Sequence, residues 1–292
     1  MFFTHSKMCK YLNSYSAVIY NYYISLKINI IIYNFIVNTM EKPVVVYTDH
    51  IMNRTLCYNF AKGADSPMCD INNFREYHAT IATYGVLRGT FELIQKVNNF
   101  FYMDHGYFNQ SKREFIDNQT NVLNMEGYFR IVYNNFIHNG EGDYPDDRLN
   151  KLNLNIVEQN KSGTYIILSE PSEIMKKIYN KPNWVNDTKK ILKSYTDRPL
   201  IIHNKFSKEN LDDLLKNAWA FISLQSTAGF KAMLKGVPAF FTDQSLKNIA
   251  KIKNIESPSI NYKIFNNLSY GQWTLNEISS GEAWANIQKN AQ

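Results

Sequence analysis

Residues 219–244, with the sequence WAFISLQSTAGFKAMLKGVPAFFTDQ, decide the fold class of this chain. The apolar run at 220–224 predicts a buried strand, and polar residues then lead through Gly229 into a helical segment that stops at Gly236. A second apolar run follows at 238–242. Strand, helix and strand at this spacing indicate a parallel sheet whose strands are connected by helices.

The same alternation extends toward the N-terminus. Apolar runs predict strands at 164–168 and 199–203, with helices at 183–195 and 211–218 between the strands of this half. The first half of the chain has similar runs at 44–47, 99–103 and 129–136, and we expect a helix within 79–97.

These patterns predict an α/β protein made of two Rossmann-like domains, with parallel sheets facing across a cleft. We place an N-terminal domain at 40–155 and a C-terminal domain at 156–292. Ligands of such sheets collect at the carboxyl ends of the strands, which is where the polar clusters of this sequence fall.

Composition excludes several classes of protein. The chain has 292 residues, 45% of them hydrophobic and 20% charged, as in ordinary globular domains. Its three cysteines, Cys9, Cys57 and Cys69, form no CxxC pair, which argues against a disulfide framework or a structural zinc site.

The first 39 residues differ from the rest of the chain. They contain three lysines and no Asp, Glu or Arg, which leaves 29 basic and 26 acidic residues and a net charge of +3 in the remainder. That small excess argues against a nucleic-acid partner. Lys27 lies in the middle of the apolar stretch 16–37 and disfavours a membrane span. We expect residues 1–39 to be a non-core extension ahead of a start at Met40, with a membrane-surface anchor or an additional helix as alternatives.

The turn after the strand at 220–224 is a candidate binding site. Gln225, Ser226 and Thr227 precede the helix that Gly229 opens, and backbone N–H groups at a helix start bind anions such as a diphosphate. Ser and Thr are also common helix N-caps without any ligand, so both readings stay open.

The stretch resembles the nucleotide-sugar motif of GT-B glycosyltransferases, and in particular of bacterial capsule and surface-polysaccharide enzymes. That motif runs roughly S-x-x-G-x-E-A-L-x-x-G-x-P, and this chain matches it at the positions Ser226, Gly229, Ala232, Leu234, Gly236 and Pro238. The good match covers about 25 residues. Where the family has an acidic residue that holds donor hydroxyl groups, this chain has Lys231.

The resemblance implies that the domain at 40–155 binds the acceptor and the domain at 156–292 binds the nucleotide sugar, and it implies further contacts with the donor. Asp243 and Gln244 resemble an Asp-Gln pair that grips the donor sugar in some GT-B enzymes. His203 and Lys205 follow a predicted strand, at a place where similar transferases bring a basic residue or a histidine to the diphosphate. A solvated loop is the alternative for this second pair.

Asp104 and His105 are the candidate catalytic residues in the first half. Glycosyl transfer needs a base that removes the proton from the acceptor hydroxyl, and both residues end a predicted strand next to Gly106. Asp49 and His50 form a weaker candidate of the same kind. We expect Arg130, in contrast, to form an ion pair at a loop without a role in the site.

Together these features predict a cytoplasmic glycosyltransferase, peripheral to the membrane if residues 1–39 anchor it. It would move a sugar from a nucleotide diphosphate sugar to a hydroxyl acceptor without a cofactor. The resemblance implies that no metal is needed, because helix N–H groups and basic side chains neutralise the leaving diphosphate in such folds, and the sequence agrees in having neither a DxD pair nor a His/Cys ligand cluster. The alternatives are a nucleotide-sugar epimerase of the same build, a non-catalytic nucleotide- or glycan-binding module, and a DNA-modifying glucosyltransferase.

Overall fold

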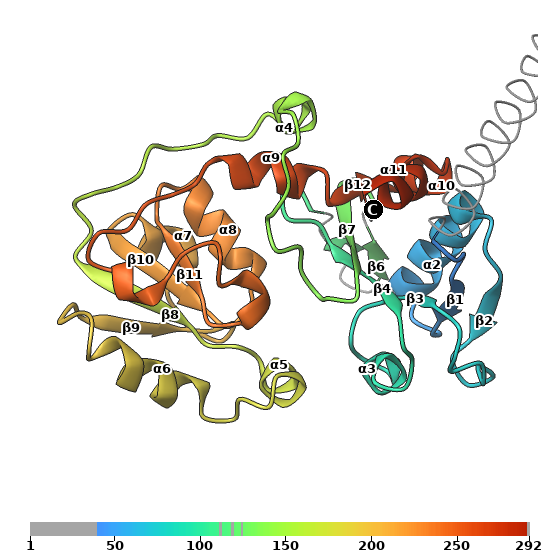
Figure 1. The fold of residues 1–292 in the computed structure, drawn as a ribbon, viewed down its shortest axis with the longest axis horizontal. Coiled ribbons are helices and arrows are strands. Elements are labelled where there is room, and N and C mark those ends of the chain that lie inside the picture. The colour runs from blue at the N-terminus through green and yellow to red at the C-terminus, as the bar shows by residue number, and fades with distance from the viewer. Residues whose placement is uncertain (1–39, 111–112, 118–119, 124, 291–292) are drawn as a thin grey trace, which may run out of the picture. The chain divides into compact units, whose positions relative to one another are not determined.

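The computed structural model describes residues 40–290, except 111–112, 118–119 and 124 (Figure 1). The predictions for residues 1–39 therefore lie outside the described residues. By internal contacts, Lys42–Ala283 forms one large compact unit. All contacts described below lie within the large unit.

Six strands form a mixed sheet in the order β12-β7-β4-β3-β1-β2. Neighbours among the first four strands in sequence run parallel, whereas β7 is antiparallel to both β4 and β12. The bounds are Val44–Tyr47 (β1), Met68–Asp70 (β2), Ile81–Tyr84 (β3), Phe100–His105 (β4), Tyr128–Tyr133 (β7) and Gln272–Thr274 (β12).

Helices α2 (Ile51–Ala64) and α3 (Thr90–Ile94) accompany this sheet. Leu93 and Ile94 of α3 share a core cluster with Val46, Ile81 and other residues. The predicted helix within 79–97 is wrong over its first part, because Ile81–Tyr84 is a strand and only Thr90–Ile94 is helical. Gly85 and Gly89 have φ values of +74° and +85°, which turn the chain between the two elements.

Four strands form a wholly parallel sheet in the order β11-β10-β8-β9. Alternate residues of its strands enter two core clusters: Ile167 and Phe221 pack with residues of α7 and α8, and Ile166 and Ile222 pack with residues of α6. Helices therefore cover both faces of this sheet, as Figure 1 also shows. The bounds are Tyr165–Ser169 (β8), Leu200–His203 (β9), Ala218–Ser223 (β10), Ala239–Phe241 (β11), Trp184–Leu192 (α6), Leu211–Leu215 (α7) and Thr227–Leu234 (α8).

The other described elements are short. They are β5 (Arg113–Asp117), β6 (Thr120–Leu123), α4 (Asp147–Lys151), α5 (Glu173–Ile178), η1 (Gln244–Leu246), η2 (Ile252–Asn254), α9 (Lys263–Ser269), α10 (Leu275–Ser279) and α11 (Glu282–Asn290).

The C-terminal segment returns to the first sheet. After the four-stranded sheet is complete, α9 leads to β12, which pairs with β7 through Gln272, Trp273 and Thr274. The Gln272 side chain is fully buried, and its Oε1 accepts hydrogen bonds from the Tyr107 and Phe108 amides at 2.7 and 2.9 Å. The returning strand thus fixes the backbone that follows β4.

The architecture agrees with the sequence at the level of two α/β sheets consistent with two Rossmann-like domains. The expectation that both sheets are parallel is wrong for the first sheet, because β7 and β12 join it antiparallel. The cleft and the boundaries at 40–155 and 156–292 stay predictions. In the described part of the chain, no helix is both long and apolar enough to cross a membrane.

Candidate active site

Asp104 and Arg130 lie opposite each other at one edge of the six-stranded sheet. Asp104 is near the end of β4, and Arg130 is its partner in the antiparallel register of β7. Because β7 runs against β4, its first residues lie beside the last residues of β4. Arg130 Nη2 donates to Asp104 Oδ2 at 2.9 Å, and both side chains are largely buried, at 11% and 26% exposure.

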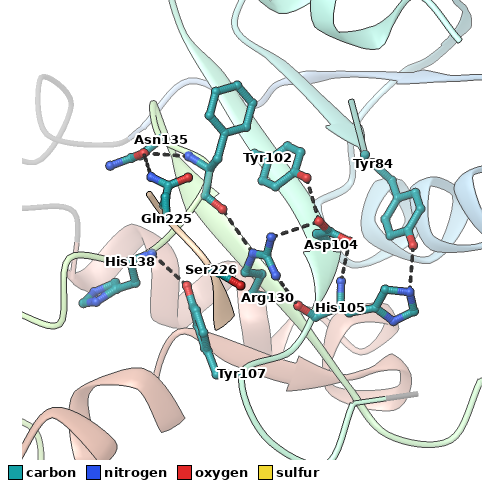
Figure 2. A network of polar contacts seen from close by, with 12 residues as sticks. Tyr84, Tyr102, Asp104, His105, Tyr107, Arg130, Asn135, His138, Gln225 and Ser226 are labelled. Carbon is teal, nitrogen blue, oxygen red and sulfur yellow. Dashed lines mark hydrogen bonds and ion pairs between the residues drawn. The ribbon is translucent and has the colours of Figure 1, made fainter. Parts of the chain in front are cut away.

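Asp104 receives two further hydrogen bonds (Figure 2). The Tyr102 hydroxyl donates to Oδ2 at 2.6 Å, and the amide of His105 donates to Oδ1 at 2.8 Å. A carboxylate can accept about four hydrogen bonds, so these three donors leave one acceptor position on Asp104. Burial, reinforced by the charge of Asp104, raises the pKa of Tyr102 well above its ordinary value, so the tyrosine stays a donor.

Arg130 is held on several sides. Its Nη1 donates to the carbonyl of His105 at 2.7 Å and its Nε to that of Phe136 at 3.1 Å. Its guanidinium lies 5.6 Å from the ring centroid of Tyr102 and 5.9 Å from that of Tyr107. Burial alone would lower the pKa of Arg130, but Asp104 and the nearby tyrosines outweigh it and leave the pKa raised. The arginine is therefore a permanent cation beside Asp104.

His105 is oriented by aromatic neighbours. Its Nε2 lies 3.4 Å from the Tyr84 hydroxyl, and its ring is stacked on Phe129 at a centroid distance of 6.3 Å. Tyr84 also donates to Met52 Sδ at 2.6 Å. The imidazole thus leaves β4 toward Tyr84, while the Asp104 carboxylate turns to Arg130 (Figure 2).

The turn after β10 presents uncharged polar groups. Ser226 is the N-cap of α8, and its Oγ accepts from the Ala228 amide at 3.2 Å. The Gly229 amide donates to the Ser226 carbonyl at 3.0 Å. These two amides are therefore engaged within the turn itself, so the N-cap reading of Ser226 holds, and an anion would rely mainly on side chains and the remaining amides.

Gly229 has a packing role in this helix. A Cβ atom added to Gly229 would lie 2.6 and 2.7 Å from ring atoms of Phe241 on β11. The glycine allows α8 to approach the sheet closely. A larger residue at position 229 therefore tests helix packing before it tests ligand binding.

Gln225 connects the turn to neighbouring segments. The hydroxyl of Tyr179 donates to its Oε1 at 2.5 Å, and its Nε2 lies 3.5 Å from Asn135 Oδ1. Burial, together with the charge of Asp243, raises the pKa of Tyr179. Gln225 is thus held from two sides by residues distant in sequence, at the rim of the same pocket that Asp104 lines.

One pocket of about 320 Å³ contains both sets of predicted residues. Asp104 and His105 line it from the first sheet, and Gln225, Ser226 and Thr227 line it from the turn between β10 and α8. Its other lining residues are Val86, Tyr102, Gln110, Arg130, Phe136, Ile137, Ser172, Ile174 and Met175. A carboxylate, an imidazole, a buried cation and several neutral hydrogen-bonding groups therefore meet around one cavity.

The remaining predicted residues are not among those that line this pocket. His203 Nε2 lies 3.3 Å from the Glu209 carbonyl, and Lys205 Nζ lies 4.8 Å from the Phe206 ring centroid. Asp243 caps η1 by accepting from the amide and hydroxyl of Ser245, and Gln244 is the first residue of that helix.

Lys231 is engaged with an acidic neighbour. Its Nζ lies 2.9 Å from Asp212 Oδ2, and both side chains are about half exposed. The position at which the glycosyltransferase motif has an acidic residue therefore holds a surface ion pair between α8 and α7.

Arg130 is the site residue that sequence reasoning missed. It forms an ion pair as expected, but its partner is the predicted base Asp104, and its location is a strand that lines the pocket. The apolar run at 129–136 predicts the strand itself, but β5 and β6 lie between β4 and β7, so the sequence does not indicate that β7 pairs with β4 or in which direction.

Among the described residues, no group of three or more His, Cys, Asp and Glu side chains could hold a metal ion. The prediction that catalysis needs no metal stays a prediction.

Comparison with known proteins gives distant structural matches. No family model matches the chain, and none of the curated proteins matches it. It is similar to the β-Kdo 2,7 transferase of Thermosulfurimonas dismutans KpsC, with 9% identity and a TM-score of 0.41 over 83% of this chain and 99% of that one. For the β-Kdo 2,4 transferase of the same KpsC, the identity is 9% and the TM-score 0.40, over 80% of this chain and 92% of that one. We transfer no residue role from either structure.

Proposed function

We propose that this chain is a glycosyltransferase that moves a sugar from a nucleotide diphosphate sugar to the hydroxyl group of an acceptor. The observation that carries the proposal is the pocket that Asp104 and His105 share with Gln225, Ser226 and Thr227. The turn with these last three residues bears the resemblance to nucleotide-sugar motifs. The first pair supplies what transfer to a hydroxyl group requires, which is a proton acceptor.

In this proposal Asp104 is the base. Its one remaining acceptor position takes the proton of the acceptor hydroxyl while the acceptor oxygen forms a bond to the anomeric carbon. The bond from that carbon to the diphosphate breaks, and its electron pair leaves with the diphosphate. Arg130 keeps the Asp104 carboxylate in place and places a positive charge at the wall of the pocket.

Gln225 and Thr227 would hold the donor through neutral hydrogen bonds. Thr227 is the first residue of α8 and lines the pocket, so in this proposal its hydroxyl and those amides of the helix start that the turn does not engage would bind an anionic group. Ser226 has a structural task as the cap, which makes it a poorer choice for testing ligand binding.

A thermal-shift screen against UDP, GDP, CMP, ADP and dTDP, with and without Mg²⁺, tests donor binding. A nucleotide present at 100 times its dissociation constant should add about 2.7 kcal/mol to stability. Thr227→Val should weaken binding of that nucleotide about tenfold, whereas the control Thr55→Val on α2 should leave it unchanged. Equal affinity in both variants would remove Thr227 from the site, and no binding to any nucleotide would contradict the proposal.

The base is tested by turnover. Once a donor is known, Asp104→Asn should lower turnover on the order of 100-fold or more while donor affinity is kept. Wild-type turnover in this variant would move the base to His105, which His105→Gln would then examine.

A further inference from the structure

A second pocket adjoins the first at Asp104. It has a volume of about 220 Å³ and shares Val86, Tyr102 and Asp104 with the pocket described above. We call it the Thr48 pocket; its other lining residues are Thr48, His50, Asn53, Tyr84, Gly85, Leu87 and Arg88. The shared carboxylate means that a molecule in the Thr48 pocket reaches the same base as one in the larger pocket.

The N-terminus of α2 lies at the Thr48 pocket. This helix is 14 residues long, its N-cap residue His50 lines the pocket, and the His50 side chain makes no capping hydrogen bond. The first turn contains no acidic residue. The partial positive charge of a helix N-terminus is thus not offset by a carboxylate of its own first turn.

The Thr48 hydroxyl gives independent evidence for a ligand. Thr48 is only 4% exposed and lines the pocket, yet its hydroxyl has no hydrogen-bond partner among the described residues. Its amide is occupied, since it donates to Asn53 Oδ1 at 2.7 Å, and Asn53 Nδ2 in turn donates to the Tyr84 carbonyl at 2.7 Å. An unpaired hydroxyl group at a cavity wall can donate a hydrogen bond to a polar ligand atom or accept one from it.

Arg88 adds a full positive charge to this pocket. It belongs to the turn 85–89, which Thr90 ties by donating to the carbonyls of Gly85 and Leu87 at 2.9 and 2.7 Å. Within the part of the chain that the structure describes, Arg88 has no ion-pair partner. Arginine suits carboxylate and phosphate groups because its planar fork can donate two parallel hydrogen bonds.

We propose that the Thr48 pocket binds a negatively charged group of the acceptor, a carboxylate or a phosphate, so that an acceptor hydroxyl reaches Asp104. The identification of the ligand as a sugar acceptor rests on the proposed function. The anion site itself rests on Thr48, Arg88 and the N-terminus of α2. The lining suits such a molecule, because the cationic Arg88 and the Thr48 hydroxyl share the pocket with the Asp104 carboxylate. The volume suits a single sugar unit.

Calorimetric titration of the full chain with glucuronate, glucose 6-phosphate and glucose tests the inference. One or both of the charged sugars should bind at least about tenfold more tightly than glucose, and the better of the two identifies the acidic group. Arg88→Gln should weaken that binding about tenfold or more, and Thr48→Val should weaken it to a smaller extent. The control Arg54→Gln removes an equal charge from α2, at a residue that does not line this pocket, and should leave binding unchanged.

Three results would overturn the inference. Equal affinity for glucose and for both charged sugars would show that charge is not recognised, and equal losses in Arg88→Gln and Arg54→Gln would show a non-specific charge effect. Competition between the charged sugar and the nucleotide found in the thermal-shift screen would place both in one pocket. Nucleotide binding separates the failure of this inference from the failure of the proposed function. If Arg88→Gln binds the nucleotide as wild type does and no charged sugar binds to the wild-type protein, only the inference fails. If the wild-type protein binds no nucleotide at all, the assignment of the pocket as an acceptor site fails together with the proposed function.

Discussion

The two sheets deliver different chemistry to the same pocket. The four-stranded sheet is parallel throughout, and the turn after β10 presents the neutral groups of Gln225, Ser226 and Thr227. The six-stranded sheet presents a buried ion pair, because antiparallel β7 starts where β4 ends and sets Arg130 opposite Asp104. The comparison teaches that one reversed strand is enough to bring a charged partner to the carboxyl end of a parallel strand, where connecting loops usually supply the polar groups.

The largest effect should come from breaking that ion pair. Arg130→Met removes the charged partner of the buried Asp104 carboxylate and the side-chain donor to the carbonyls of His105 and Phe136, so we expect a loss of about 3 kcal/mol in the free energy of unfolding. Urea unfolding at pH 7 measures it. The control Lys216→Met breaks an ion pair with Asp213 whose side chains are 72% and 69% exposed, and should cost less than about 0.5 kcal/mol. Similar losses of stability in the two variants would show that the buried ion pair in the six-stranded sheet contributes no more than an exposed one.

A second prediction tests the packing of α8 against β11, which supports the turn after β10. Gly229→Val directs side-chain atoms into the Phe241 ring and should destabilise the protein by about 2 kcal/mol. Thermal unfolding gives the difference, and adding Phe241→Leu should restore part of it because the ring atoms are removed. The control Lys231→Val introduces valine at a half-exposed position of the same helix, α8, and should lower the stability by less than about 1 kcal/mol. If the Phe241 change restored nothing, the contact would not explain the loss.

A third prediction concerns the return of the chain to the six-stranded sheet. Glu277 accepts from Arg148 Nη1 at 2.7 Å and from the amide and hydroxyl of Thr274, the N-cap of α10. Burial alone would raise the pKa of Glu277. The hydrogen bonds from Arg148 and Thr274 and the positive charge of Arg148 outweigh burial, so the pKa is lowered. Glu277→Gln should cost about 1.5 kcal/mol at pH 7.

The pH dependence of that loss follows from the sign of the shift. A lowered folded-state pKa stabilises the protein above the unfolded value of about 4.3, and the contribution disappears as pH falls through the folded value. Urea midpoints of wild type and Glu277→Gln should therefore converge as pH falls from 6 toward 3. A constant difference over this range would assign the effect to shape rather than charge.

The smallest effect is expected at Lys231. Its ion pair with Asp212 is half exposed, so Lys231→Ala should change stability by at most about 0.5 kcal/mol. Nucleotide affinity should not change either, because Lys231 does not line the pocket. A clear change of affinity in the thermal-shift assay would show that this side chain reaches the donor.

How far the sequence predicts the fold differs between the halves. In the second half, continuous apolar runs at 164–168 and 220–224 correspond to β8 and β10, because strands covered on both faces are apolar throughout. In the first half, Ile81, Ala82 and Thr83 are all buried in β3, but so short a run beside a helix-like pattern cannot be distinguished from part of a helix by its periodicity. Helix α2 had a detectable signal in Met52, Leu56 and Phe60, spaced by four residues.

The sequence predicts those parts of the candidate site that directly follow a predicted strand. Asp104 and Ser226 follow apolar runs, so their place at the edge of a sheet could be inferred. The link between Arg130 and Asp104 depends on the direction of β7, which hydrophobicity does not encode. The three-residue strand β12 gives no pattern of its own, so its pairing with β7 could not be found from sequence.

The pairing of β12 with β7 also means that the six-stranded sheet can be completed only late in translation. Gln272, which binds the amides after β4, leaves the ribosome 165 residues after Tyr107. At roughly 5–20 residues per second, the edge strand β7 would wait on the order of ten seconds or more for its neighbour. Until then the six-residue strand β7 is an exposed edge, which is a target for chaperones and for pairing with other chains, so synthesis speed is expected to influence the yield of folded protein.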